Sequence, residues 1–356
     1  MFGDRLERAR KAAGLSLRAL GEKVGVSQTA ISKYEKGQMT PDSTVLIKLS
    51  HALDVKVEYF FRPDAFTFSL ENVEYRKRDI PKKNLDLINA KILDKIERRF
   101  ELESFFPKPP VPVFALPGDL PEQIQSPDEI DDIADQVRNQ WNLGLNPIPE
   151  LIDVLEANGI RVFTIDDSID NKFDGLATKI HEQPIVVISS DWPGDRQRFT
   201  LAHELGHLVL EKRLPKSVDE EKAANRFAGA FLLPKQSIKK ELGEYRNFIE
   251  VQELSLLKQE YGISMQGAFI RAYQTGIIEN KQYQILWQMF KKRGWLTTEP
   301  GDPYPSEDPH VFQQFVFHAL AEEFIGESKA AELMNMSVHD FYHLRMIEDG
   351  HAASDQ

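Results

Sequence analysis

Cysteine is absent from the 356 residues of the chain. Its absence excludes disulfide bonds and thiolate metal sites, and it fits a reducing cytosol. Long apolar runs are also missing. No stretch approaches the roughly 18 residues of a membrane-spanning helix, and no signal-like apolar segment is present. We therefore expect a cytoplasmic protein without a membrane partner, long enough for two or more domains.

Excess positive charge is missing from the chain as a whole, which has a net charge of −12. By itself this charge argues against a nucleic-acid binder. The distribution is uneven, however, because residues 1–62 carry 11 Lys and Arg against 7 Asp and Glu, a net charge of +4 that leaves −16 for the rest. This pattern predicts a basic N-terminal module joined to an acidic body.

An H-E-x-x-H pattern, His203-Glu204-Leu205-Gly206-His207, lies within the apolar stretch at residues 198–210. Two histidines four residues apart lie on one face of a helix and can bind one metal ion. Glu204 then lies beside the metal, where a general base for a zinc-activated water belongs. Leucines at 201, 205 and 208 predict a buried stripe on the same helix. The alternative is a pair of core histidines with satisfied hydrogen bonds.

A candidate third ligand follows on a second predicted helix. Ser217 and Glu220 have the S-x-x-E form of a capping box, so we predict a helix from Ser217 to Leu233. Glu220 is then engaged locally and Glu221 is the predicted third ligand, with Glu220 as the next candidate. Asn225 is predicted to hydrogen-bond a ligand histidine. Two His and one Glu leave a fourth position open, as in a catalytic Zn²⁺ site. The alternative for Glu221 is a solvated acid in a first helical turn.

Residues 1–62 predict a bundle of short helices with a helix-turn-helix in it. Ser16 and Ser27 are expected N-caps, and the turn at residues 25–27 contains a glycine. The run Ser-Gln-Thr-Ala-Ile-Ser-Lys-Tyr-Glu-Lys-Gly at 27–37 resembles the DNA-binding domain of the XRE (lambda repressor-like) family, and this resemblance covers residues 3–61. It implies a homodimer on a double-stranded DNA operator with paired half-sites. A helix-turn-helix used for protein contacts is the alternative.

The third helix of this module is expected to enter the major groove, with Ile31 and Tyr34 packed inward. Gln28 can pair with adenine and Thr29 can meet a base edge, whereas basic side chains position the protein on phosphates. The predicted DNA-binding residues are Arg18, Ser27, Gln28, Thr29, Ser32, Lys33 and Lys36.

The middle of the chain predicts a small sheet. Before the sheet we predict a strand pair at residues 66–75, a long helix at 83–103 and a Pro-rich linker at 106–112. Strands are predicted at 160–165, 175–180 and 184–189, directly before the H-E-x-x-H helix. The third strand is expected to offer an edge on which an extended peptide substrate pairs.

Residues 128–280 resemble the ImmA/IrrE metallopeptidases, through the three strands, residues 198–210 and the run Glu221-x-x-Ala224-Asn225-x-Phe227-Ala228 to Pro234. The resemblance implies that His203, His207 and Glu221 bind zinc and that Glu204 is the base. In the best-known members of this family the peptidase cuts a helix-turn-helix repressor, often in stress or mobile-element responses. Ala223 stands where the family often has an acid. A second pattern, His339-Asp340-Phe341-Tyr342-His343, is expected to be a solvated helix face because little chain follows for a third ligand.

The predicted fold class is α+β. It comprises a helix-turn-helix domain at 1–62, a strand, long helix and linker at 63–124, a zincin-like metallopeptidase domain at 125–285 and a helical region at 286–356. The predicted function is a DNA-binding transcriptional regulator with a zinc-dependent endopeptidase that cleaves a repressor, another regulatory protein or itself. The alternative is a helix-turn-helix repressor or antitoxin-like regulator whose peptidase-like domain is a non-catalytic sensor.

Overall fold

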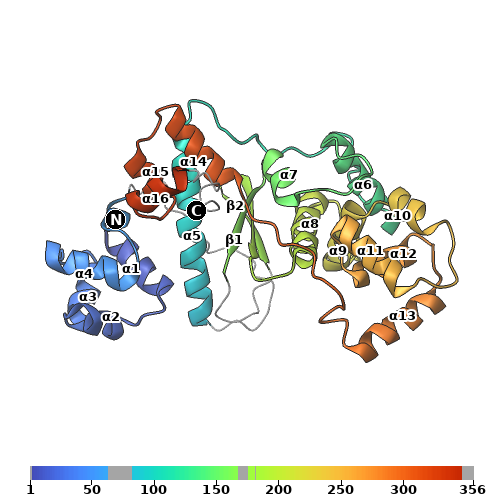
Figure 1. The fold of residues 1–356 in the computed structure, drawn as a ribbon, viewed down its shortest axis with the longest axis horizontal. Coiled ribbons are helices and arrows are strands. Elements are labelled where there is room, and N and C mark those ends of the chain that lie inside the picture. The colour runs from blue at the N-terminus through green and yellow to red at the C-terminus, as the bar shows by residue number, and fades with distance from the viewer. Residues whose placement is uncertain (1, 63–81, 167–174, 181, 347–356) are drawn as a thin grey trace, which may run out of the picture. The chain divides into compact units, whose positions relative to one another are not determined.

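The computed structural model describes residues 2–62, 82–166, 175–180 and 182–346, and it divides into two units (Figure 1). Of the described residues, 2–62, 82–110 and 310–346 form the first unit, and the others form the second. The second unit is therefore inserted into the first. The strand pair expected at 66–75 lies outside the described residues.

The N-terminal part of the first unit is a bundle of short helices around a helix-turn-helix. Its elements are α1 (Phe2–Ala12), α2 (Leu17–Val24), α3 (Gln28–Glu35), α4 (Ser43–Leu53) and the 3₁₀ helix η1 (Val57–Phe61). The two predicted caps are confirmed. The Ser16 hydroxyl accepts a hydrogen bond from the Ala19 amide, and the Ser27 hydroxyl accepts one from the Ala30 amide, each at 3.1 Å. Gly21 permits the tight turn, since a Cβ there would lie 2.7 Å from the carbonyl oxygen of Val26.

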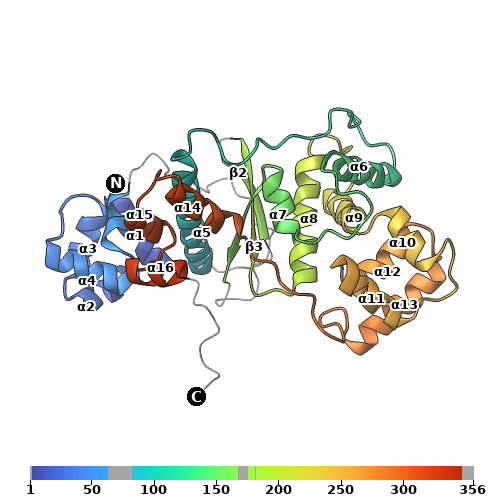
Figure 2. The ribbon, with the colours of Figure 1, turned by 45° about the horizontal axis from the view of Figure 1, so that its top comes forward.

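The C-terminal helices complete the same unit. Helix α5 (Lys82–Ser104) packs on α1 and also on α14 (Val311–Ala321) and α15 (Glu327–Leu333), and α16 (Val338–Arg345) packs on α15 (Figures 1 and 2). Buried Leu102 of α5 joins an apolar cluster with Val316, Leu333 and Phe341. The two ends of the chain thus share one unit.

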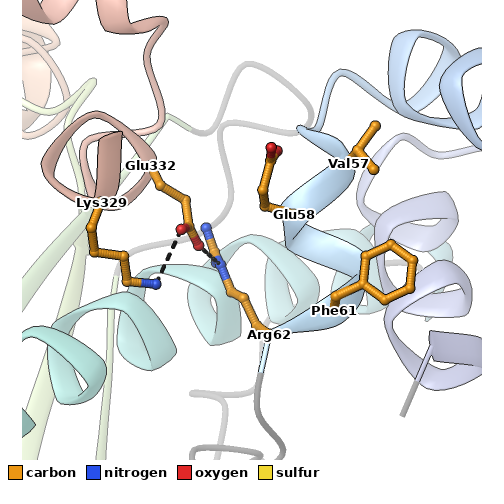
Figure 3. Close-up of a pocket in the computed structure, with 6 residues that line it drawn as sticks. All are labelled: Val57, Glu58, Phe61, Arg62, Lys329 and Glu332. Atoms are coloured by element: carbon orange, nitrogen blue, oxygen red, sulfur yellow. Dashed lines mark hydrogen bonds and ion pairs between the residues drawn. The ribbon is translucent and has the colours of Figure 1, made fainter. Parts of the chain in front are cut away.

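Ion pairs join the helix-turn-helix to α5 and the C-terminal helices. Arg62 lies between Asp94 and Glu332, at 2.9 Å from each. Glu332 also pairs with Lys329 at 3.1 Å, and Arg62, Lys329 and Glu332 border a shallow pocket of about 270 Å³ (Figure 3). One turn further along α5, Glu97 binds Arg5 at 3.0 Å and also pairs with Arg8.

The second unit contains a three-stranded sheet and a set of helices. Its elements are α6 (Pro127–Gln140), α7 (Leu151–Ala157), β1 (Arg161–Ile165), β2 (Gly175–Ile180), β3 (Gln183–Ser189), α8 (Gly194–Leu210), α9 (Glu220–Leu232), α10 (Lys235–Leu242), α11 (Val251–Tyr261), α12 (Met265–Gln274) and α13 (Asn280–Arg293). Of these helices, α7 and α8 pack on the strands. The three strands predicted here are confirmed. Their order is β1-β3-β2, with β1 parallel and β2 antiparallel to β3. The expectation that β3 offers a free edge is wrong, because β3 pairs on both sides.

Helix α8 is fixed at the centre of this unit by packing on β3, β2 and α9. Its first turn is also held by a later segment of the chain. The Gly194 amide donates to the Tyr304 carbonyl at 2.9 Å, and fully buried Arg198 pairs with Glu307. Arg198 also donates to the Ile148 carbonyl at 2.7 Å. In the described parts of the chain, none of the helices combines the length and apolar character needed to cross a bilayer.

Candidate metal centre and DNA-facing helix

His203 and His207 lie one turn apart on α8. Their Nε2 atoms are 2.9 Å apart and their ring centroids are 4.7 Å apart. His203 is buried at 2% exposure, whereas the His207 side chain is 20% exposed. The predicted apolar stripe is confirmed at Leu201 and Leu205, which are fully buried. The helix therefore turns leucines into the core and both histidines toward the same point.

Helix α9 begins later than the sequence predicted. The capping box at Ser217 is wrong, since the amide of Val218 closes a turn onto the carbonyl of Pro215 and Asp219 takes the N-cap position. The Asp219 side chain accepts from the Lys222 amide at 3.1 Å. Glu220 and Glu221 are therefore the first two residues of α9, and Glu220 is free of the local role that the capping box would have given it.

A close helix contact brings the start of α9 to the histidines. A Cβ at Gly206 would lie 3.1 Å from a ring carbon of Phe227 and 3.2 Å from the carbonyl oxygen of Ala224. Glycine at the fourth position of the H-E-x-x-H pattern thus allows α9 to approach α8 closely. The same approach places Glu221, one turn before Ala224, beside the histidine rings.

Glu221 faces both histidines. One of its carboxylate oxygens lies 3.6 Å from His203 Nε2, and the other lies 3.4 Å from His207 Nε2. In the parts of the chain that the structure describes, His203, His207 and Glu221 form the only group of three or more such side chains that could hold a metal ion. The Glu221 side chain is 59% exposed, so the group opens to solvent on this side.

The outer nitrogens of both rings are held by oxygen atoms. Nδ1 of His203 lies 2.8 Å from Asn225 Oδ1, as the sequence predicted for Asn225, and Nδ1 of His207 lies 3.1 Å from a carboxylate oxygen of Glu220. An amide oxygen and a carboxylate only accept hydrogen bonds, so each Nδ1 carries the proton. In the neutral rings, both Nε2 lone pairs then point at each other across 2.9 Å. The two lone pairs repel each other unless one cation binds both nitrogens, so the donor set fits a metal ion.

The role of Glu220 was not anticipated from the sequence. Its contact with His207 depends on where α9 begins, which the false capping box concealed. The only sequence signal for this role of Glu220 is that two acids stand next to each other at the start of a helix. Glu204, the predicted base, follows His203 on α8 and is buried at 4% exposure.

The helix-turn-helix presents most of its predicted DNA-binding side chains to solvent. Ile31 and Tyr34 are buried as expected. The exposed residues are Arg18, Ser27, Gln28, Thr29, Lys33 and Lys36, and Ser32 is half-buried. Arg18 pairs with Glu22 on its own helix at 2.8 Å, and this hydrogen bond raises the pKa of the exposed guanidinium. The Ser27 hydroxyl is engaged in capping α3.

Comparisons with known proteins agree with this two-part architecture. The profile of the family described as "IrrE N-terminal-like domain" (Peptidase_M78) matches residues 155–273, and the profile described as "Helix-turn-helix" (HTH_3) matches residues 6–60. The first match contains α8, α9 and all three strands. The second contains α2 and α3.

Three relatives are named as a repressor protein or as HTH-type transcriptional regulators. "Repressor protein C2" of Salmonella phage P22 is 35% identical over 89 residues, which are 25% of this chain and 40% of the relative. The SPbeta prophage-derived uncharacterized HTH-type transcriptional regulator YonR of Bacillus subtilis is 32% identical over 73 residues, 20% of this chain and 68% of the relative. The HTH-type transcriptional regulator ImmR of the same organism is 30% identical over 97 residues, 27% of this chain and 65% of the relative.

These matches identify the class as helix-turn-helix transcriptional regulators. The chain belongs to the XRE-type helix-turn-helix family and carries an IrrE/ImmA-like domain of the Peptidase_M78 family.

Proposed function

We propose that this chain is a DNA-bound zinc endopeptidase that cleaves a regulatory protein. The observation that carries the proposal is the group formed by His203, His207 and Glu221, in which both histidine Nε2 atoms converge beside one carboxylate. The oxygens on both Nδ1 atoms favour the tautomers that a metal ion requires. A structural role alone would not need this convergence.

His203, His207 and Glu221 would hold the zinc ion. When bound, zinc supplies Lewis acidity: it polarises a carbonyl group and lowers the pKa of a water molecule toward about 7. Two nitrogens and one carboxylate leave room for that water and the substrate. Asn225 and Glu220 orient the two imidazole rings and keep their protons on Nδ1.

Glu204 is the proposed general base. It follows the first ligand histidine by one residue, so the helix sets it beside the metal rather than beneath it. Its carboxylate would take a proton from the attacking water and deliver it to the nitrogen of the leaving amine. Its side chain belongs to a residue buried at 4% exposure.

The substrate segment would pair with β2. Of the described strands, β1 and β2 each pair on one side, and α8 packs on β2 and β3. A peptide extended along β2 would thus lie next to the helix that carries the histidines. Lys179 on this strand already reaches α8's end, where it pairs with Glu211 at 2.6 Å.

The helix-turn-helix would place the enzyme on an operator. Gln28 and Thr29 would read base edges from the start of α3, while Lys33 and Lys36 would contact phosphates. Paired half-sites would be bound by a homodimer. The proposed DNA partner supports a location in the cytoplasm. The proposed substrate is a helix-turn-helix repressor or this chain itself, in a stress or mobile-element response, as the family resemblance implies.

The decisive experiment compares new protein N-termini in cells that express the chain or its Glu204→Gln variant. The substitution keeps size and zinc ligands but removes the base. We expect a cleavage product that appears only with Glu204, in unstressed or DNA-damaged cells. Identical N-termini under both conditions would favour a DNA-binding regulator whose peptidase-like domain is a non-catalytic sensor. Zinc analysis of both proteins verifies that the metal is retained.

A further inference from the structure

A second histidine pair lies on α16, outside the proposed catalytic site. His339 and His343 are four residues apart, with Nε2 atoms 3.2 Å apart and ring centroids 4.4 Å apart. Both residues are exposed. In the described part of the chain, these histidines do not belong to a group of three potential ligands. The solvated helix face nevertheless directs two ring nitrogens toward one point.

We propose that His339 and His343 form a second, open chelating site for a late first-row divalent metal such as Ni²⁺, Cu²⁺ or Zn²⁺. With metal–nitrogen bonds of about 2.05 Å, a nitrogen separation of 3.2 Å corresponds to an angle of about 100° at the metal. This value lies between the square and tetrahedral angles that these ions adopt. Two imidazoles without a carboxylate select such ions over Mg²⁺ and Ca²⁺.

The helix that carries this pair is already ordered by its own contacts. Phe341 is fully buried and stacks on Phe317, with ring centroids 5.8 Å apart. Ser337 caps the helix by accepting from the Asp340 amide at 3.0 Å, and its hydroxyl donates to the Asp340 carboxylate at 2.6 Å. Chelation therefore costs little conformational freedom. The Ser337 hydroxyl holds one oxygen of the Asp340 carboxylate at the start of the helix. The proposed chelate uses the two imidazoles alone, with water at the remaining metal positions.

Metal on α16 would stabilise the unit that contains the helix-turn-helix. The carbonyl of Met336, just before the helix, accepts a hydrogen bond from Lys56, at the end of the DNA-binding module. A ligand that binds only the folded helix stabilises it by mass action. The site would thus link metal availability to the order of the C-terminal helices and their contact with residue 56.

The test is a Ni²⁺ titration of the untagged, full-length chain, with the α8 site saturated beforehand with Zn²⁺. We expect one Ni²⁺ per chain and about 10²-fold weaker binding in His343→Gln, because the second ring acts at high effective concentration. The matched control is His343→Gln combined with Leu344→His, which keeps the number of histidines but breaks their spacing. Leu344 is 42% exposed, so histidine is tolerated there.

The register-shifted variant decides the outcome. Binding weakened to the level of His343→Gln supports a chelate, while binding equal to that of the parent shows independent histidines and overturns the proposal. Absence of Ni²⁺ binding by the parent also overturns it. Thermal unfolding with Ni²⁺ gives a second readout, because only the parent should gain stability. If the chelating site proves wrong, the proposed peptidase is not affected, since cleavage depends on Glu204.

Discussion

Adjacent acids have different tasks at the candidate metal centre. Glu221 faces both Nε2 atoms at 3.4–3.6 Å, whereas Glu220 lies 3.1 Å from the opposite nitrogen of His207. We therefore propose that Glu221 is a metal ligand and that Glu220 orients one. A one-residue step on a helix turns the side chain by about 100°, so each acid reaches a different side of the ring.

Glutamine substitutions should separate these tasks. We expect Glu220→Gln to weaken zinc binding by about 10–100-fold, as removal of an outer hydrogen-bond partner does. Glu221→Gln should weaken it further, because it removes the charged ligand itself. The measurement is competition for zinc with a chelator of known affinity. If Glu220→Gln were the more damaging change, the two assignments would have to be exchanged.

At the scale of elements, we propose that helix α3 makes two kinds of DNA contact. Its first residues, Gln28 and Thr29, are exposed next to the turn, and Lys33 is exposed one turn later. Short polar side chains at the start of the helix suit base edges. Long basic side chains suit phosphates, which carry no sequence information.

Alanine substitutions should distinguish these contacts. Gln28→Ala should cost about 1–3 kcal/mol on the preferred operator and relax selection at one adenine. Lys33→Ala should weaken binding to all sequences evenly and reduce the salt dependence by about one counterion. Affinities measured on the operator and its single-base variants, at several salt concentrations, check both. An even loss across sequences with Gln28→Ala would exclude base readout by this residue.

The contact between η1 and α15 depends on a half-buried acid. Burial would raise the pKa of Glu332, but the hydrogen bond from Arg62 and the charge and hydrogen bond of Lys329 outweigh it and lower the pKa. A lowered folded-state pKa means that this stabilisation is complete above the unfolded value of about 4.3. It is lost as the pH falls through the folded-state pKa.

We expect Glu332→Gln to ease local opening of α15 by about 1–2 kcal/mol at neutral pH, because the Arg62 side chain, 6% exposed, loses one of its two charged acceptors and keeps only Asp94. Hydrogen exchange of α15 and η1 amides should become about tenfold faster. The matched control is Glu327→Gln, whose pair with Arg345 is exposed and should contribute little. At a pH below the folded-state pKa, parent and variant should converge; a constant difference would rule out ionisation as the cause.

Local signals predicted most elements, but contacts between distant residues were not predictable. The caps at Ser16 and Ser27 and the three strands follow from near neighbours, so the sequence sufficed for them. Strand order depends on pairing between distant segments, which is why β3 was expected at an edge. The start of α9 was misplaced because Ser217 and Asp219 compete for one helix end, and geometry decides between them.

At the scale of the molecule, the second unit is an insertion between two parts of the first. The chain leaves the first unit after α5 and returns at residue 310. Phe106, at the exit, contacts the rings of Phe315 and Phe324 beyond the return point, with centroids 5.7 and 5.6 Å apart. The sequence offered no periodic signal for this return, since it depends on side chains more than 200 residues apart.

This topology predicts that one cut in the exit linker will not free the helix-turn-helix. With a specific protease site introduced between Lys108 and Pro109, both exposed, fragment 1–108 should remain bound to the rest after cleavage. The buried cluster of Leu102 with α14–α16 and the pair Arg62–Glu332 hold it. Size-exclusion chromatography of the cleaved protein under native conditions tests this, and a separate fragment would contradict it. Adding Leu102→Asp should release the fragment from cleaved protein only. Self-cleavage at this linker would therefore not detach the peptidase from DNA, whereas cleavage of a separate repressor needs no such release.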